Sequence, residues 1–197
     1  MISKLKVHPA KSQLEYRARI QAHGDRTGLG FFGRASHDIA HVDKCVVAHP
    51  KIQEAWTQFA KARPLAELAK GNGTFKVEWT LAETGQVREA INQKHASFGF
   101  TQVNPEQNRV LVDLVATLAK KTKKRNVLFD LYGGDGNLSN ALTGEFTHTI
   151  SVDSFNNGHY PDELGDTLPK GRTLVRKSVE DFLANRYWMD WGFRDVD

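Results

Sequence analysis

The sequence has little or none of several features that define whole classes of protein. It has one cysteine among 197 residues, Cys45, which excludes an intramolecular disulfide and a metal site built from several thiolates. It has no run of 18 apolar residues, and its N-terminal stretch lacks the apolar segment of a secretory signal. We therefore expect a cytoplasmic protein with no membrane partner.

Metal binding is not expected either. His37 and His41 are four residues apart, the spacing of a zinc-binding pair on a helix. The residues around them alternate between polar and apolar, as is typical of a strand, and positions four apart on a strand lie about 13 Å from each other. The sequence thus predicts no metal site.

Charge is unevenly distributed along a chain of ordinary globular composition. The net charge is only +4, but residues 1–126 carry +10 and residues 127–197 carry −6. A basic region attracts a polyanion such as RNA, whose phosphates release counterions when Lys and Arg bind them. The alternative is a well-solvated surface of a basic protein.

The first part of the chain predicts a small α+β unit. Polar and apolar residues partly alternate in 15–47, with turn residues between the runs, which predicts short antiparallel strands. Ile52, Trp56 and Phe59 then recur at helical spacing, with Pro64 as a break. Further strands are expected at residues 74–83, 86–92 and 95–100.

A second domain, residues 101–197, is expected to follow this first domain of residues 1–100. Asn104 and Pro105 predict the start of a helix. Strand and helix patterns then alternate, which predicts a parallel sheet whose ligands lie beyond the carboxyl ends of the strands. The helix has an apolar face of Val110, Leu111, Leu114, Val115 and Leu118. The expected strands are residues 126–131, 147–154 and 172–178, with a final helix at 178–188.

The basic cluster Lys120–Arg125 follows the first helix of this domain. Cations there interact favourably with the C-terminal end of the helix dipole. A phosphate-binding patch is the alternative function of the cluster.

A glycine-rich turn, Asp130–Gly136, separates the first strand of this domain from the start of a helix. Glycines permit positive φ and let a ligand lie against the backbone, and a helix N-terminus offers free amides. A dinucleotide-binding turn has the pattern G-x-G-x-x-G, and Ser139 stands at its third glycine position. The pattern D-L-x-x-G-x-G instead resembles motif I of class I methyltransferases, which use S-adenosylmethionine.

Two further segments resemble one methyltransferase family. The run Phe98–Asn104 looks like the F-x-Q-V-N segment that precedes motif I in RNA (uracil-5-)-methyltransferases. The strand Tyr16–Arg19, followed by a G-F-x-x and an S-x-x-I-type segment that leads to Cys45, looks like the central domain of that family. The resemblance runs from about residue 14 to the end of the chain, in three ordered segments at matching spacing.

The resemblance implies S-adenosylmethionine as the cofactor and a uridine of tRNA or rRNA as the target. In that family a cysteine thiolate adds to C6 of uracil, and C5 then attacks the methyl group. The residues that the resemblance implies for cofactor binding are Gln102, Asp130, Tyr132, Gly134, Gly136 and Asp153, with Asp153 on the ribose hydroxyls. The residues that we expect to contact RNA are Arg17, Arg19, Arg26, Arg34 and Lys44.

The later signatures of the family are absent. The chain has neither the D-P-P-R segment nor the catalytic cysteine motif, and we expect Cys45 to be an inert, buried or half-buried thiol. The fold class expected is therefore α/β, with the α+β unit followed by the first half of a Rossmann-like methyltransferase domain, truncated before its catalytic motifs. A sheet left incomplete has an unpaired edge through which the chain can self-associate. The alternatives are a non-catalytic RNA-binding or regulatory module and an incompletely folded remnant.

Overall fold

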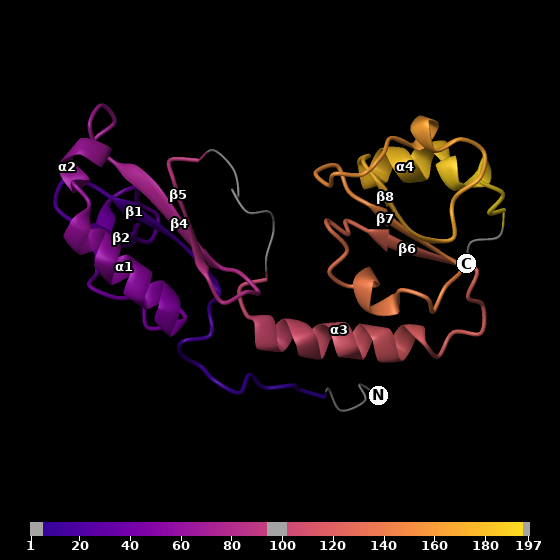
Figure 1. Cartoon of the computed structure of the whole chain (residues 1–197), viewed down its shortest axis with the longest axis horizontal. Helices are drawn as coiled ribbons and strands as arrows, with labels where there is room; N and C mark the ends of the chain where they lie inside the picture. Colours follow the sequence, from indigo (N-terminus) through magenta and orange to yellow (C-terminus); the bar gives the residue numbers. More distant parts are fainter. Residues whose placement is uncertain (1–5, 94–101, 195–197) are drawn as a thin grey trace. The chain divides into compact units, whose positions relative to one another are not determined.

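A computed structural model describes residues 6–93 and 102–194 (Figure 1). The chain has two compact units, Met1–Asn108 and Arg109–Asp197. One has an antiparallel sheet and the other a parallel sheet, so the expectation of a mixed α/β protein is confirmed. The expected strand at 95–100 and the domain boundary expected after residue 100 lie outside the described residues.

The first unit is built on a five-stranded antiparallel sheet with the order β3-β2-β1-β4-β5. The alternation in 15–47 produces its first three strands, and the turn between β1 and β2 falls at the expected turn residues. The strands are β1 (Arg19–Gly24), β2 (Leu29–Phe32), β3 (Ile39–His41), β4 (Phe75–Leu81) and β5 (Val87–Ile91).

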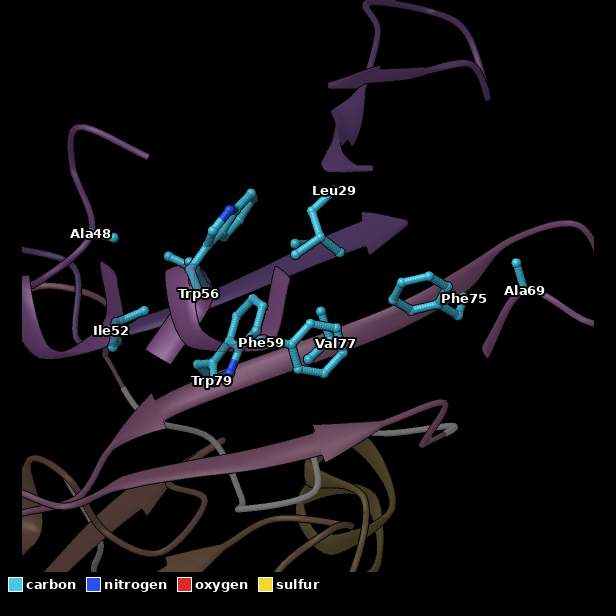
Figure 2. Close-up of a cluster of buried hydrophobic side chains, with 11 residues drawn as sticks. Leu29, Ala48, Ile52, Trp56, Phe59, Ala69, Phe75, Val77 and Trp79 are labelled. Carbon is cyan, nitrogen blue, oxygen red and sulfur yellow. The ribbon is translucent and has the colours of Figure 1, made fainter. Parts of the chain in front are cut away.

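Helix α1 (Pro50–Ala62) packs on the sheet with the apolar stripe that its sequence predicts. Ile52, Trp56 and Phe59 are its buried residues, and Figure 2 shows them against the side chains of β4. The chain breaks after α1, and α2 (Leu65–Leu68) begins directly after Pro64, as Pro favours. The buried core of this unit comprises Ile20, Ala22, Leu29, Ala48, Ile52, Trp56, Phe59, Ala69, Phe75, Val77 and Trp79.

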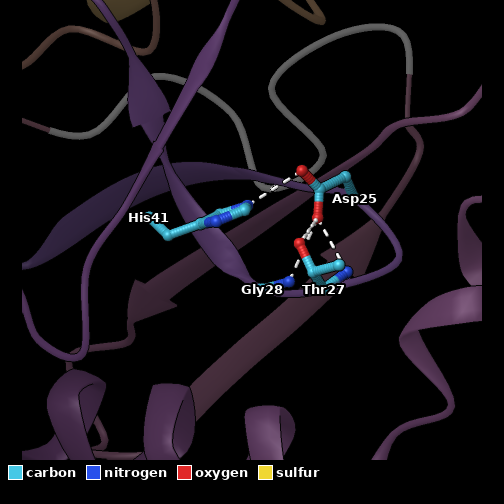
Figure 3. Close-up of polar contacts among 4 residues, drawn as sticks. All are labelled: Asp25, Thr27, Gly28 and His41. Atoms are coloured by element: carbon cyan, nitrogen blue, oxygen red, sulfur yellow. Dashed lines mark hydrogen bonds and ion pairs between the residues drawn. The ribbon is translucent and has the colours of Figure 1, made fainter.

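The turn between β1 and β2 is fixed by the carboxylate of Asp25 (Figure 3). One oxygen of Asp25 accepts hydrogen bonds from Thr27 and Gly28, and the other lies 2.8 Å from Nε2 of His41 in β3. Burial raises the pKa of Asp25, but these hydrogen bonds outweigh burial and lower it to about 2. Asp25 therefore joins three consecutive strands through one turn.

Helix α3 (Pro105–Ala119) begins where its sequence predicts. The side chain of Asn104 accepts a hydrogen bond of 3.0 Å from the amide of Gln107, as an N-cap does. The helix has no buried residue, and the exposed fraction of Leu118 is 56%. At its end, Arg125 donates to the carbonyl of Lys120 and pairs with Glu145, so part of the basic cluster has a structural role.

The second unit contains a three-stranded parallel sheet in the order β6-β7-β8, as the alternation of elements predicts. The apolar segments of the sequence form its strands, and Ser178 caps the final helix. The strands are β6 (Val127–Leu131), β7 (His148–Val152) and β8 (Gly171–Val175), and the helix is α4 (Val179–Asn185). The 3-10 helices are Ser139–Leu142, Pro161–Leu164 and Tyr187–Met189.

The helix expected after the glycine-rich turn differs from the prediction. The structure has only the 3-10 helix Ser139–Leu142 there, because the chain turns away at Gly144, whose φ is +84°. The turn therefore lacks an α-helix N-terminus with its free amides. Within residues 6–93 and 102–194, no helix has the length and apolar character needed to cross a bilayer.

Candidate functional site

The candidate site lies where β6 and β7 end, at the same edge of the parallel sheet. The pairing of β6 with β7 ends at Leu131, which lies opposite Val152. The amide of Gly133 then donates a hydrogen bond of 3.2 Å to the carbonyl of Val152, so the glycine-rich turn begins next to the end of β7. Asp153, the next residue after β7, is thereby brought beside the turn.

The turn has a backbone that only a glycine-rich segment readily adopts. Gly134 and Gly136 have φ values of +53° and +82°, and Tyr132 has +57°, in a region that costs non-glycine residues energy. The amide of Gly134 points to Asp153 and donates a hydrogen bond of 3.1 Å to its carboxylate. The acid after the second strand and the glycine-rich turn are therefore in direct contact.

Asp130 supports the turn from below. Its carboxylate accepts a hydrogen bond of 3.2 Å from the hydroxyl of Ser151. A Cβ added to Gly133 would lie 2.3 Å from that hydroxyl and 2.7 Å from Asp130, a contact that real side chains do not make. Gly133 is therefore required because the turn lies directly against these two polar side chains.

Tyr132 reaches across to the element that follows β8. Its hydroxyl donates a hydrogen bond to Glu180, in the first turn of α4. That bond raises the pKa of Tyr132 and lowers the pKa of Glu180. Glu180 is not among the cofactor-binding residues expected from the sequence. Its position at the start of the helix that follows the third strand is the signal that could have found it, because this position lies at the same edge of the sheet.

Arg172, in β8, holds the other end of the turn. Its guanidinium donates to the carbonyl of Asp135. A Cβ added to Gly136 would lie 2.0 Å from Nη2 of Arg172, so the arginine occupies the space of the missing side chain. Nε of Arg172 is buried with no hydrogen-bond partner among the described residues. No local sequence pattern predicts this contact, since it arises from the pairing of parallel strands.

The site is acidic at the edge where a ligand would bind. Asp135, Asp153 and Glu180 lie in or beside the turn. The cations at this edge are engaged elsewhere: Arg172 with a carbonyl, Arg176 with the ring of Tyr160 and Lys177 with Asp181. This charge favours a cationic ligand with hydroxyl groups and disfavours a pyrophosphate. In the described ranges, no three His, Cys, Asp or Glu side chains are grouped to hold a metal ion.

Five of the six residues expected at the cofactor lie around this turn. They are Asp130, Tyr132, Gly134, Gly136 and Asp153. The sixth, Gln102, is half-buried and belongs to the first unit, whereas the turn belongs to the second.

The residues expected at RNA all belong to the first unit, but they differ in surroundings. Arg19 forms an ion pair of 3.0 Å with Glu78, whose side chain is 3% exposed, so this arginine has a structural role. Arg17 is half-buried. Arg26, Arg34 and Lys44 are exposed and are therefore the accessible cations of the set.

The structure also gives the positions of the basic cluster Lys120–Arg125 and of Cys45. The basic cluster at the end of α3 belongs to the second unit, so the first unit, residues 1–108, carries a net charge of +5 instead of the +10 counted to residue 126. Cys45 is half-buried and packs against the core of the first unit.

The second unit has the parallel sheet, glycine-rich turn and acid after the second strand of a Rossmann-like fold. No protein-family model matches the chain, and no curated protein matches it with significance. Among solved structures, it is similar to the crystal structure of the Pyrococcus abyssi tRNA (uracil-54, C5)-methyltransferase in complex with S-adenosyl-L-homocysteine, with a TM-score of 0.55.

The sequence identity to that methyltransferase is 15%, and the similar region covers 73% of this chain and 50% of the other. This chain thus spans about half the length of its structural neighbour. At this identity the similarity concerns the fold, and it agrees with the methyltransferase-like fold that the motifs predict.

Proposed function

We propose that the protein is a relative of the RNA (uracil-C5)-methyltransferases that binds S-adenosylmethionine and acts on tRNA or rRNA. The observation that carries the proposal is the contact between the amide of Gly134 and the carboxylate of Asp153. This contact brings together the turn that resembles motif I of class I methyltransferases and the acid that the resemblance places on the ribose hydroxyls. The fold of the Pyrococcus abyssi enzyme, which was solved with S-adenosyl-L-homocysteine, supports it independently.

The residues of the turn fit this cofactor chemically. Each carboxylate oxygen of Asp153 already accepts one amide, from Gly134 and from Phe155, and each retains a second lone pair for a ribose hydroxyl. Asp135 and Glu180 supply negative charge for a ligand that carries a sulfonium and an ammonium group. When bound, the cofactor supplies an electrophilic methyl group. Gln102 is proposed as a further cofactor contact on the family resemblance alone.

We further propose that this chain is catalytically incomplete by itself. The mechanism of the family needs a cysteine thiolate beside the transferred methyl group. The one cysteine of the sequence, Cys45, is half-buried and packs against the core of the first unit, and the segment that forms the glycine-rich turn contains no thiol. The alternative is a non-catalytic RNA-binding or regulatory module. The exposed Arg26, Arg34 and Lys44 support this alternative as well as they support an RNA methyltransferase.

The cofactor proposal is tested by isothermal titration calorimetry with S-adenosylhomocysteine. The wild-type chain should bind with measurable heat, and Asp153→Ala should weaken binding about tenfold or more, because hydrogen bonds to a charged acceptor are lost. Asp162→Asn, which changes an exposed acid of the same unit, should leave the affinity unchanged. No heat at millimolar ligand, or equal binding by Asp153→Ala, would contradict the proposal, and preference for a nicotinamide dinucleotide would replace it.

A further inference from the structure

Three ring side chains form an exposed cluster on the first unit, and the cofactor site does not involve them. The rings of His23 and Phe32 are stacked, with centroids 3.8 Å apart and planes at 27°. His37 meets Phe32 at 5.7 Å and 64°. We call His23, Phe32 and His37 the ring cluster.

The ring cluster lies on the face of the sheet opposite the core. His23 pairs with Gly30 across β1 and β2, and Phe32, two residues beyond Gly30, points to the same face. The neighbouring residue in β1, Ala22, is fully buried on the other face. The exposed fraction of Phe32 is 43%, so a large aromatic residue keeps much of its surface in water.

This exposure is not explained by packing within the unit. The register of β2 with β1 and β3 determines which side chains of β2 point to the core. Because Phe32 points to the opposite face, it cannot be buried in the core without a change of register. His23 already covers one face of the Phe32 ring, and His37 meets it at an angle. Phe32 nevertheless keeps 43% of its surface exposed, beside an ordered strand.

Two turns hold the ring cluster in place. The turn after Phe32 is closed by a hydrogen bond of 2.9 Å from the amide of Gly33 to the carbonyl of Asp38, and Ser36 bonds to the Asp38 carboxylate. The turn before β2 is fixed to β3 by Asp25 and His41 (Figure 3). The rings therefore need little ordering when a ligand stacks on them, which reduces the entropic cost of binding.

The turns beside the ring cluster carry exposed arginines together with two carboxylates that are engaged within the turns, since Asp25 accepts from Thr27 and Gly28 and Asp38 accepts from Ser36. Arg34 extends from the turn that joins Phe32 to His37, and Arg26 from the turn between β1 and β2; both are exposed. Lys76 pairs with His23 across β1 and β4. Burial and this lysine lower the pKa of His23, so its ring stays neutral and stacks as an uncharged aromatic near pH 7.

We infer that the ring cluster is a stacking platform for an unpaired RNA base, with Arg26 and Arg34 placed to contact the flanking phosphates. An aromatic surface bordered by cations is the arrangement that binds single-stranded nucleic acid, since every base offers a flat face to stack. Gln21, exposed and within 3.3 Å of His23, adds an amide at the side of the platform for a base edge. The inference deepens the RNA part of the proposed function and rests on it.

The test measures binding of a short fluorescein-labelled single-stranded RNA of mixed sequence to the full chain by anisotropy. Phe32→Leu keeps an apolar side chain but removes the ring, so affinity should fall about tenfold with no change in the salt dependence. Phe32→Tyr should bind like wild type. Met189→Ala, which removes an apolar side chain that is also 43% exposed, on the second unit, should also bind like wild type.

Two further measurements separate stacking from charge. Arg26→Ala with Arg34→Ala should lower the salt slope of RNA binding, as the loss of phosphate contacts requires. Heparin, a polyanion without bases, should bind Phe32→Leu as tightly as wild type. An equal loss for heparin, or full RNA affinity in Phe32→Leu, would overturn the platform while RNA binding itself stands. No RNA binding by the wild-type chain would overturn the RNA part of the proposed function as well.

Discussion

The two units use similar amphipathic segments, but they bury them to different degrees. Helix α1 buries Ile52, Trp56 and Phe59 against the antiparallel sheet, whereas α3, which is two residues longer, buries none of its residues. Strand β4 has five buried residues out of seven, and β6 has none out of five. The first unit therefore has a closed core, and the second keeps apolar surface in water.

The sheet types account for this difference. A parallel sheet is normally covered on both faces and flanked by further strands. Strand β6 pairs only with β7 among the described strands. The groove beside it, of about 690 Å³, is lined both by aromatic side chains and by cations, namely Phe129, Phe146, Phe193, Lys123, Lys124 and Arg194. The outer edge of β6, which has no partner among the described strands, is where we expect self-association, as predicted from the sequence. An antiparallel sheet, in contrast, needs only one face covered, here by α1, and its other face can remain in contact with water.

The largest effect should come from opening the closed core. Trp79 is fully buried, and its indole N–H donates a hydrogen bond of 3.0 Å to the carboxylate of Glu89. Trp79→Ala should lower the free energy of unfolding of the first unit by about 3–5 kcal/mol, because it leaves a large cavity in the core. Urea unfolding, followed by circular dichroism, should show this shift in one transition. Trp191 belongs to the buried core of the second unit, beside Phe182. Trp191→Ala should therefore shift the other transition, and equal shifts of both transitions in either variant would contradict two separately stabilised units.

A smaller effect should come from the glycine-rich turn. Gly136→Ala should destabilise the second unit by about 2–3 kcal/mol, since φ is +82° and the added Cβ meets Arg172. Gly144 is the matched control, because its φ is +84° and nothing lies within 4 Å of an added Cβ.

Gly144→Ala should therefore show the backbone cost alone, about 1 kcal/mol. Combining Gly136→Ala with Arg172→Ala should recover the steric part of the loss. Thermal unfolding of the wild type, the two glycine variants and the double variant measures both the backbone cost and the steric cost. Equal losses in the two glycine variants would show that Arg172 does not constrain the turn.

The smallest change in stability should come from protonation of Asp25 at low pH. The pKa of Asp25 in the folded protein, about 2, is below its unfolded value of about 3.9. Its contribution to stability is therefore complete above pH 4 and is lost as the pH falls from 4 toward 2. Asp25→Asn should cost the first unit about 1 kcal/mol at pH 7 and much less near pH 2. Asp43→Asn, at an exposed acid of the same unit, should cost little at either pH, and a pH-independent loss in Asp25→Asn would show that the charge is not responsible.

Local patterns predicted most of the elements, because short-range physics determines them. The strands of the first sheet follow from alternation, and Asn104 and Pro64 mark helix boundaries through hydrogen bonding and ring geometry. The glycine-rich turn and Asp153 were found for the same reason, since the carboxyl ends of successive parallel strands meet at one edge.

Long-range contacts decided the rest, and no local pattern encodes them. The carboxylate of Glu78, 59 residues away, engages Arg19, which the sequence had assigned to RNA. Arg172 comes to lie against Gly136 only because β8 pairs with β7 and the turn folds back over them. Phe32, His23 and His37 are spread over 15 residues of sequence, and only the register of β1 with β2 places them in one exposed cluster. The sequence alone determined which side chains could bind a cofactor or RNA, and the pairing of strands decided which of them are free to do so.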